Sequence, residues 1–158
     1  MPESRAVKAE VEKQKANEAK WTKPVMSAGW TAIPSILLEK QHALGLDALD
    51  INIIGHLTIY WWTKQNLPHP AVKTMAKAIG VAPRTIQKRI KAMEDLGFIK
   101  RIQRRRPGLA NATNQYNLDG LIKKLTPYAE EKTEAKEATK KKEAERVASK
   151  KPKLSVVS

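Results

Sequence analysis

Residues 72–97 have the pattern of two short helices joined by a tight turn. A helix is expected over residues 72–79, and Gly80 can close it because glycine readily adopts the left-handed conformation found at helix ends. Pro83 suits the first position of a second helix, which should run to about residue 96. So short a break between two helices predicts a helix-turn-helix.

The residue types at three positions support this prediction. In a helix-turn-helix, a small residue in the first helix allows close crossing, a glycine opens the turn, and a β-branched residue fills the crossing point. Ala76, Gly80 and Ile86 meet these needs at the expected spacing.

The second helix has two distinct faces. At about 100° per residue, Ile86, Ile90 and Met93 form one narrow apolar stripe that should be buried. The remaining positions of its first turns carry Arg, Lys, Thr and Gln, which can hydrogen-bond to guanine, adenine or phosphate groups. The acidic residues Glu94 and Asp95 stand at the C-terminal end and are expected to lie away from a bound groove.

The positive charge is concentrated in the same part of the chain. The formal net charge is +14, and residues 72–106 alone contain eleven Lys and Arg against two acidic residues. Such a distribution indicates a polyanionic partner, and double-stranded DNA is the partner expected here.

Two short strands should follow, over residues 98–103 and 113–118, with a basic loop between them. The inward-facing members of this hairpin are expected to be Ile99, Ile102, Tyr116 and Leu118. The expected DNA contacts on the two helices and the hairpin are Lys73, Arg84, Thr85, Gln87, Lys88, Lys91, Lys100, Arg101, Arg104, Arg105 and Arg106.

The segments MAKAIGVAPRTIQKRIKAMEDLGFIKR and RRRPGLANATNQYNL resemble the winged helix-turn-helix modules of bacterial regulators and of plasmid or phage replication proteins. The likeness covers about residues 29–128 and includes an N-x-Y-x-L second wing strand. It implies a mainly α fold with a small antiparallel β-hairpin. It also implies DNA binding, with the base-reading positions at Arg84, Thr85, Gln87, Lys88 and Lys91.

The chain divides into three parts. Residues 1–24 form a charged flexible tail, either disordered or a marginal exposed helix, and residues 129–158 form a Lys- and Glu-rich tail. Residues 25–128 form the winged helix-turn-helix domain. Its core helix should begin at Asp47 or Asp50 and run to about residue 64. The apolar stripe of this helix comprises Ile53, Ile54, Leu57, Tyr60 and Trp61. Two further short helices should carry Pro34 in the first turn and Asp119 as a cap, respectively.

Some features allow two interpretations. Trp30, Trp61 and Trp62 could stack on bases, as in single-strand binders, but packing into the core is the favoured interpretation. Asp47 and Asp50 could form a pair of carboxylates, but helix capping explains them better.

The cap of the second helix also has two explanations. Ala82 precedes Pro83 where Ser or Thr is usual, at a cost of about 1 kcal/mol. The backbone N–H groups left free there can bind phosphate or water equally well.

Several functional classes lack their usual motifs. The chain has no cysteine, and His42, His56 and His69 do not have the spacing of metal ligands. No phosphate-binding glycine loop or nucleophile elbow is present, so neither an enzyme nor a cofactor is expected. No long apolar segment occurs, and neither a membrane nor a small-molecule ligand is an expected partner. A cytoplasmic, nucleoid-associated location is expected.

The leading functional hypothesis is a transcriptional regulator that binds a specific DNA sequence as a homodimer. Leu121, Ile122 and Leu125 are candidates for the dimer interface. One alternative is a replication-initiation or partition protein of a plasmid or phage. Another is a winged-helix adaptor that binds a protein partner. The module alone does not separate these roles.

Overall fold

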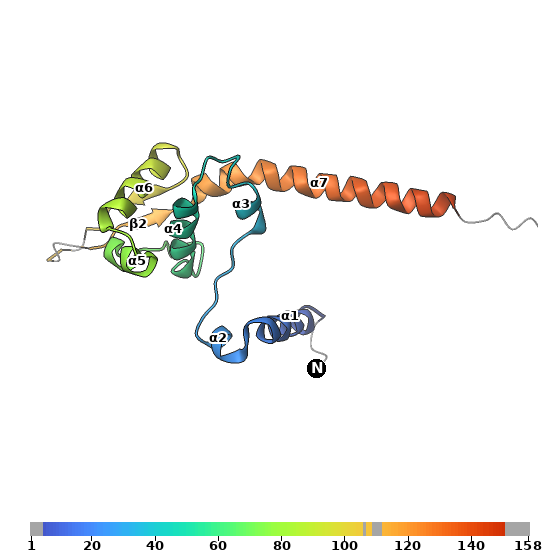
Figure 1. Ribbon diagram of the computed structural model, residues 1–158, viewed down its shortest axis with the longest axis horizontal. Coiled ribbons are helices and arrows are strands. Elements are labelled where there is room, and N and C mark those ends of the chain that lie inside the picture. Colours follow the sequence, from blue (N-terminus) through green and yellow to red (C-terminus); the bar gives the residue numbers. More distant parts are fainter. Residues whose placement is uncertain (1–4, 106, 109–111, 151–158) are drawn as a thin grey trace, which may run out of the picture.

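The computed structural model describes residues 5–105, 107–108 and 112–150, in which the chain is mainly helical with one small antiparallel sheet (Figure 1). The elements in chain order are α1 (Arg5–Trp21), α2 (Lys23–Ser27), α3 (Ser35–Glu39), α4 (Ala48–Ile59), α5 (Val72–Ile79), α6 (Pro83–Asp95), β1 (Lys100–Ile102), β2 (Gln115–Asn117) and α7 (Asp119–Ser149).

Helix α4 forms the centre of the core. Its side chains Ile53, Ile54 and Leu57 are fully buried, as the apolar stripe predicts. The helix ends at Ile59, earlier than expected, and the exposed side chain of Tyr60 does not join the stripe. A short turn closed by a bridge between residues 63 and 66 follows, so the helical pattern of the sequence extends beyond the helix itself.

The start of α4 is capped by two carboxylates. The side chain of Asp47 accepts a hydrogen bond from the backbone N–H of Asp50, and the side chain of Asp50 accepts one from the N–H of Asp47. These reciprocal bonds satisfy two N–H groups that a helix start leaves free. The capping interpretation is therefore confirmed for both residues.

Helices α5 and α6 have the bounds expected of the helix-turn-helix to within one residue. Gly80 closes α5 in the left-handed conformation, with φ 83°. Ala76 and Ile86 are buried where the two helices meet, as their small and β-branched side chains predict. Pro83 takes the first position of α6, and Ala82 provides no side-chain cap.

The hairpin pairs Arg101 with Tyr116 and Lys100 with Asn117. Ile102 pairs with Gln115, the neighbour of the buried Tyr116, and therefore faces away from Tyr116. Ile102 is half-buried and does not pack against the core, so its assignment to the inward face is wrong. The backbone N–H of Tyr116 donates to the carbonyl of Pro68 at 2.9 Å, which attaches β2 to the segment before α5.

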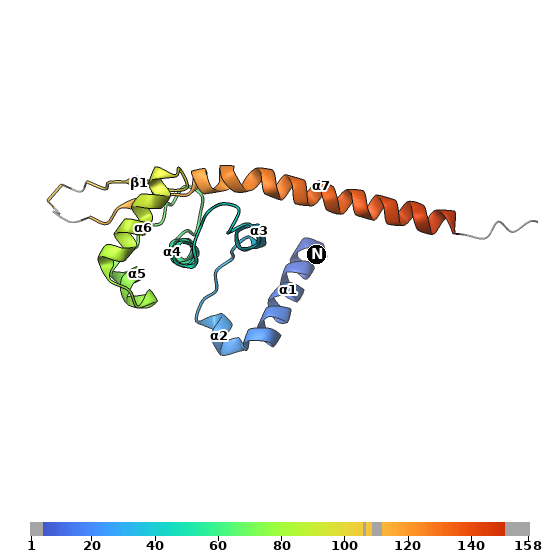
Figure 2. The same ribbon diagram turned by 45° about the horizontal axis from the view of Figure 1, so that its top comes forward.

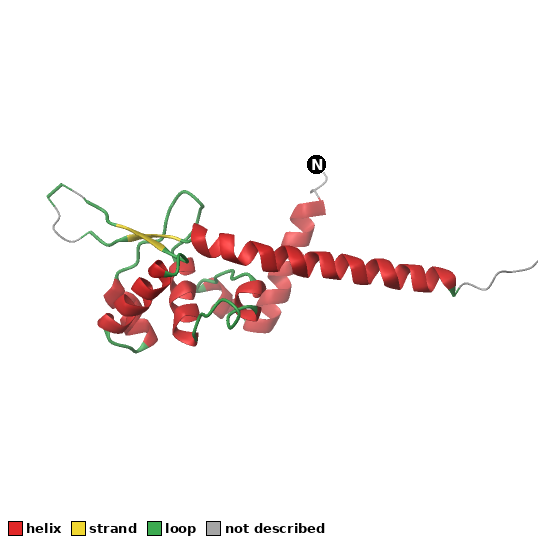
Figure 3. Ribbon diagram, turned by 90° about the horizontal axis from the view of Figure 1, so that it is seen from above, coloured by secondary structure: helices red, strands yellow, loops and turns green. Residues whose placement is uncertain are grey.

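Helix α7 begins against the hairpin and leaves the body on the side away from the loop of the hairpin (Figure 3). Asp119 is not its cap: Asp119 already lies in the helix, and its backbone N–H donates to the side chain of Asn117. The helix continues through Pro127 to Ser149 in one piece. Leu121 and Leu125 are buried in the core of the same chain.

Helices α1 and α2 contain no buried residue, and α1 stands apart from the body (Figure 2). Of the two expectations for the N-terminal tail, the exposed helix is the one observed.

The packing expected of the tryptophans is wrong for two of them: Trp30 is 70% exposed and Trp62 is 82% exposed, whereas Trp61 is half-buried against the core. Within the described residues, no helix is both long and apolar enough to cross a lipid bilayer.

Candidate nucleic-acid interface

Helix α6 separates its apolar and polar side chains as expected. Ile86, Ile90 and Met93 are buried, and the opposite face exposes a row of long polar side chains. The exposed members of this row are Arg84, Gln87, Lys88 and Lys91.

An open cleft of about 400 Å³ lies between this face and the hairpin. Four of the expected contacts on α6 line it, and Arg101 of β1 joins them from the hairpin. Four cations and two amides, those of Gln87 and Asn114, therefore line a single cavity. The residues that line the cleft are Val72, Arg84, Gln87, Lys88, Ile90, Lys91, Arg101, Asn114 and Tyr116.

Two of these cations pair with the acidic end of α6. Arg101 donates to Glu94 through its guanidinium and its backbone N–H, each at 3.1 Å, and Lys91 pairs with Asp95 at 2.9 Å. Glu94 and Asp95 thus contact expected DNA-binding residues instead of standing clear of them. Exposed pairs of this kind contribute about 0–1 kcal/mol, so an anionic ligand can replace the carboxylates at small cost.

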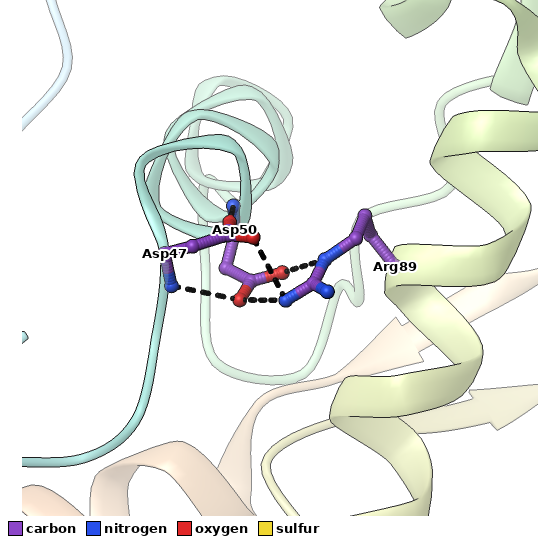
Figure 4. Close-up of polar contacts among 3 residues, drawn as sticks. All are labelled: Asp47, Asp50 and Arg89. Carbon is purple, nitrogen blue, oxygen red and sulfur yellow. Dashed lines mark hydrogen bonds and ion pairs between the residues drawn. The ribbon is translucent and has the colours of Figure 1, made fainter.

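Arg89 has a structural role that the sequence analysis missed. Its Nε donates to Asp50 Oδ1 at 2.8 Å, and its Nη2 contacts both Asp50 Oδ2 and Asp47 Oδ2 (Figure 4). The hydrogen bond to the Asp50 carboxylate raises the pKa of Arg89 above its usual value. This ion pair joins α6 to the start of α4 and so helps to set how α6 presents its polar face.

The remaining expected contacts lie outside the cleft. Lys73 is exposed on α5, Lys100 is exposed on the hairpin face opposite Arg101, and Thr85 is half-buried. In the loop between the strands, Arg104 is half-buried and Arg105 is exposed. Arg106 lies outside the described residues.

Asn114 and Tyr116 line the cleft without having been assigned to the site. Strand alternation places both on the face of Arg101, a relation readable from the sequence once the register is known. Burial raises the pKa of the Tyr116 phenol, and the nearby Arg101 partly opposes this effect. Tyr116 therefore supplies a neutral, apolar floor beside the cations.

The chain matches the DnaD N-terminal domain over residues 33–137, about two thirds of its length. It therefore belongs to the DnaD N-terminal domain family, a bacterial family of replication and DNA-binding domains. No curated protein sequence matches the chain. The family match covers α3 to α6, the hairpin and the first part of α7, and so includes the whole cleft.

Proposed function

We propose that this protein binds double-stranded DNA in a replication process, by binding alone and without catalysis. The observation that carries the proposal is the single cleft lined by four cations and by the amide of Gln87. The cations are Arg84, Lys88, Lys91 and Arg101. Cations at this density suit the phosphate backbone, and an amide among them suits an adenine edge.

The proposed arrangement is that of a winged helix-turn-helix. Helix α6 enters the major groove, so that Arg84, Gln87 and Lys88 meet base edges or phosphates. The basic loop after β1 lies along the backbone or in the minor groove, with Arg104 and Arg105 as its described contacts. The N-terminus of α6, which has no side-chain cap, is proposed to bind a phosphate group.

The family favours replication over transcriptional regulation, the role placed first from the sequence alone. DnaD-like domains bind DNA and oligomerise, which supports a homodimer as part of the proposal. The interface must differ from the one first considered, because Leu121 and Leu125 are buried within one chain and only Ile122 is exposed. A single species of monomer mass at tens of micromolar would exclude the dimer.

Charge reversal tests the cleft. The double variant Arg84→Glu with Lys88→Glu should lower the affinity for a labelled duplex by about a hundredfold, since each base or phosphate contact is worth about 1–3 kcal/mol. The matched control is Lys8→Glu with Lys13→Glu, which makes the same change of charge on the exposed helix α1. Fluorescence anisotropy gives the affinities, and circular dichroism checks the fold.

If both variants lose the same affinity for the duplex, the loss is explained by net charge alone and the cleft is not the binding site. Selection of genomic and mobile-element fragments at about 150 mM salt then separates the roles. Enrichment of clustered direct repeats supports replication initiation, whereas a motif enriched near promoters supports transcriptional regulation.

A further inference from the structure

A second groove, of about 770 Å³, lies between the N-terminal segment and the end of α4. One side consists of α2 and the linker that follows it, and the other consists of the last turn of α4 and residues 61 and 62. The principal side chains that line it are Met26, Trp30, Pro34, Ile59, Trp61 and Trp62.

The groove displays aromatic rings to solvent. Trp30 and Trp62 are 70% and 82% exposed, although indoles are among the side chains that gain most from burial. Trp61 also lines the groove, is half-buried against the core, and its Nε1–H has no hydrogen-bond partner among the described residues. A concentration of exposed aromatic surface of this kind marks an interaction site.

The charge around the groove selects the type of partner. The two stretches that line it, residues 26–34 and 58–62, contain no Asp or Glu. Two exposed lysines stand next to these stretches in the chain, Lys23 in α2 and Lys64 two positions after Trp62. A partner that is negatively charged and has flat rings available for stacking fits this surface.

Single-stranded nucleic acid has both properties. Its bases are free to stack on aromatic side chains, whereas the faces of bases in a duplex are already stacked on one another. A second copy of this chain fits less well, because a symmetric contact at this face would bring the lysines of both copies together.

We propose that this groove binds single-stranded DNA, with bases stacked on Trp30 and Trp62 and with Lys23 and Lys64 contacting the phosphates. The proposal does not depend on the duplex-binding cleft, because the two sites share no lining residue. The family match begins at residue 33, so Trp30 belongs to a part of the chain outside the matched domain.

The test uses the full chain and a fluorescein-labelled oligothymidylate of about 12 nucleotides, a length within the usual site size. Replacing Trp30 and Trp62 together by alanine should weaken binding about a hundredfold, at about tenfold for each stacked base. Affinity for a duplex should stay within about twofold of the unchanged protein. Trp21→Ala is the matched control, because Trp21 is 62% exposed but does not line the groove.

A conservative variant separates stacking from damage to the fold. Replacing both tryptophans by phenylalanine keeps an aromatic face and should restore most of the lost affinity. Unchanged binding of oligothymidylate by the alanine variant would overturn the proposal. A second result would also overturn it: an alanine variant with a lower molar mass in light scattering but unchanged affinity for oligothymidylate. The groove would then be a contact between copies of the chain.

The duplex-binding proposal can be tested separately from the single-strand proposal. Arg84→Glu with Lys88→Glu should leave oligothymidylate binding within about threefold, the change expected from lower net charge alone. A loss as large as that of the tryptophan variant would place single strands in the α6 cleft and overturn the assignment to the groove.

Discussion

The carboxylate of Asp50 performs two tasks at once. It caps α4 through the backbone N–H of Asp47, and it binds Arg89 of α6 through both of its oxygens. Asp50 is 1% exposed, whereas the Arg89 side chain remains 33% exposed. Removal of the Arg89 side chain therefore leaves a buried carboxylate without its cation. Removal of the Asp50 carboxylate leaves a guanidinium that water can reach.

This difference predicts unequal effects of the two single substitutions. Arg89→Met should lower the free energy of unfolding by about 3–5 kcal/mol, because it leaves the Asp50 charge buried and unpaired. Asp50→Asn should cost less, and the double variant should recover part of the loss from Arg89→Met. Urea unfolding of all four proteins measures the coupling. Strictly additive losses would show that the pair contributes nothing beyond its separate residues.

A second residue-scale prediction concerns alkaline pH. Burial raises the pKa of Tyr116 above its usual value of 10.0, so the folded state holds the phenol proton more tightly than the unfolded state does. The resulting stability is fully present below pH 10 and should decrease as the pH rises through the raised pKa. Tyr116→Phe lacks this ionisation and should lose less stability as the pH rises above about 10. Identical pH profiles for the two proteins would contradict the assignment.

At the scale of elements, the start of α7 is packed directly on the turn after α6. The backbone N–H of Leu121 donates to the carbonyl of Phe98 at 2.9 Å. A Cβ added at Gly120 would lie 2.0 Å from the carbonyl oxygen of Gly97, which is backbone and cannot rotate away. The absence of a side chain at Gly120 thus allows α7 to close over the core beside the hairpin.

Two helical glycines give a matched comparison. Gly120→Ala should lower the free energy of unfolding by about 1–3 kcal/mol or more, because the backbone of α7 must shift. Gly55→Ala in α4 should be neutral or stabilising by up to about 1 kcal/mol, since its Cβ would meet only Ile33 at 3.7 Å and alanine favours the helix. Thermal unfolding measures both, and equal effects would contradict the packing at α7.

At the scale of the whole molecule, the two proposed sites lie on different elements. The duplex cleft uses α6 and the hairpin, whereas the tryptophan groove uses α2, its linker and the end of α4. Helix α7 has 31 residues and so extends about 46 Å; beyond Lys132, which pairs with Glu39, its described side chains are exposed. The two proposals therefore place a duplex and a single strand at separate sites of one body.

Salt dependence tests duplex binding by the molecule as a whole. Each neutralised phosphate contributes about 0.9 to the slope of log affinity against log salt concentration, so the four cations of the cleft predict a slope of about −3.5 or steeper. Arg84→Glu with Lys88→Glu should make the slope shallower by about 2. Anisotropy titrations over a series of salt concentrations measure it. A slope near zero would show that the binding is not made through phosphates.

The amino-acid sequence by itself determined the features that act between near neighbours. The capping carboxylates of α4, the glycine that closes α5, and the two faces of α6 depend on residues within one or two turns, so their patterns could be read directly. The hairpin and the concentration of positive charge were predictable for the same reason. These local signals were enough to identify most of the residues that line the cleft.

Only the tertiary structure decided which distant residues meet. Asp50 and Arg89 are 39 positions apart. Helical periodicity places Arg89 at the edge of the apolar stripe of α6, three residues after Ile86, but it cannot tell which carboxylate Arg89 meets. The exposure of Trp30 and Trp62 likewise depends on where α4 ends and how the linker passes it. Burial and ion pairing depend on how whole helices and strands are arranged in space. The pattern of residues within one or two helical turns does not determine that arrangement.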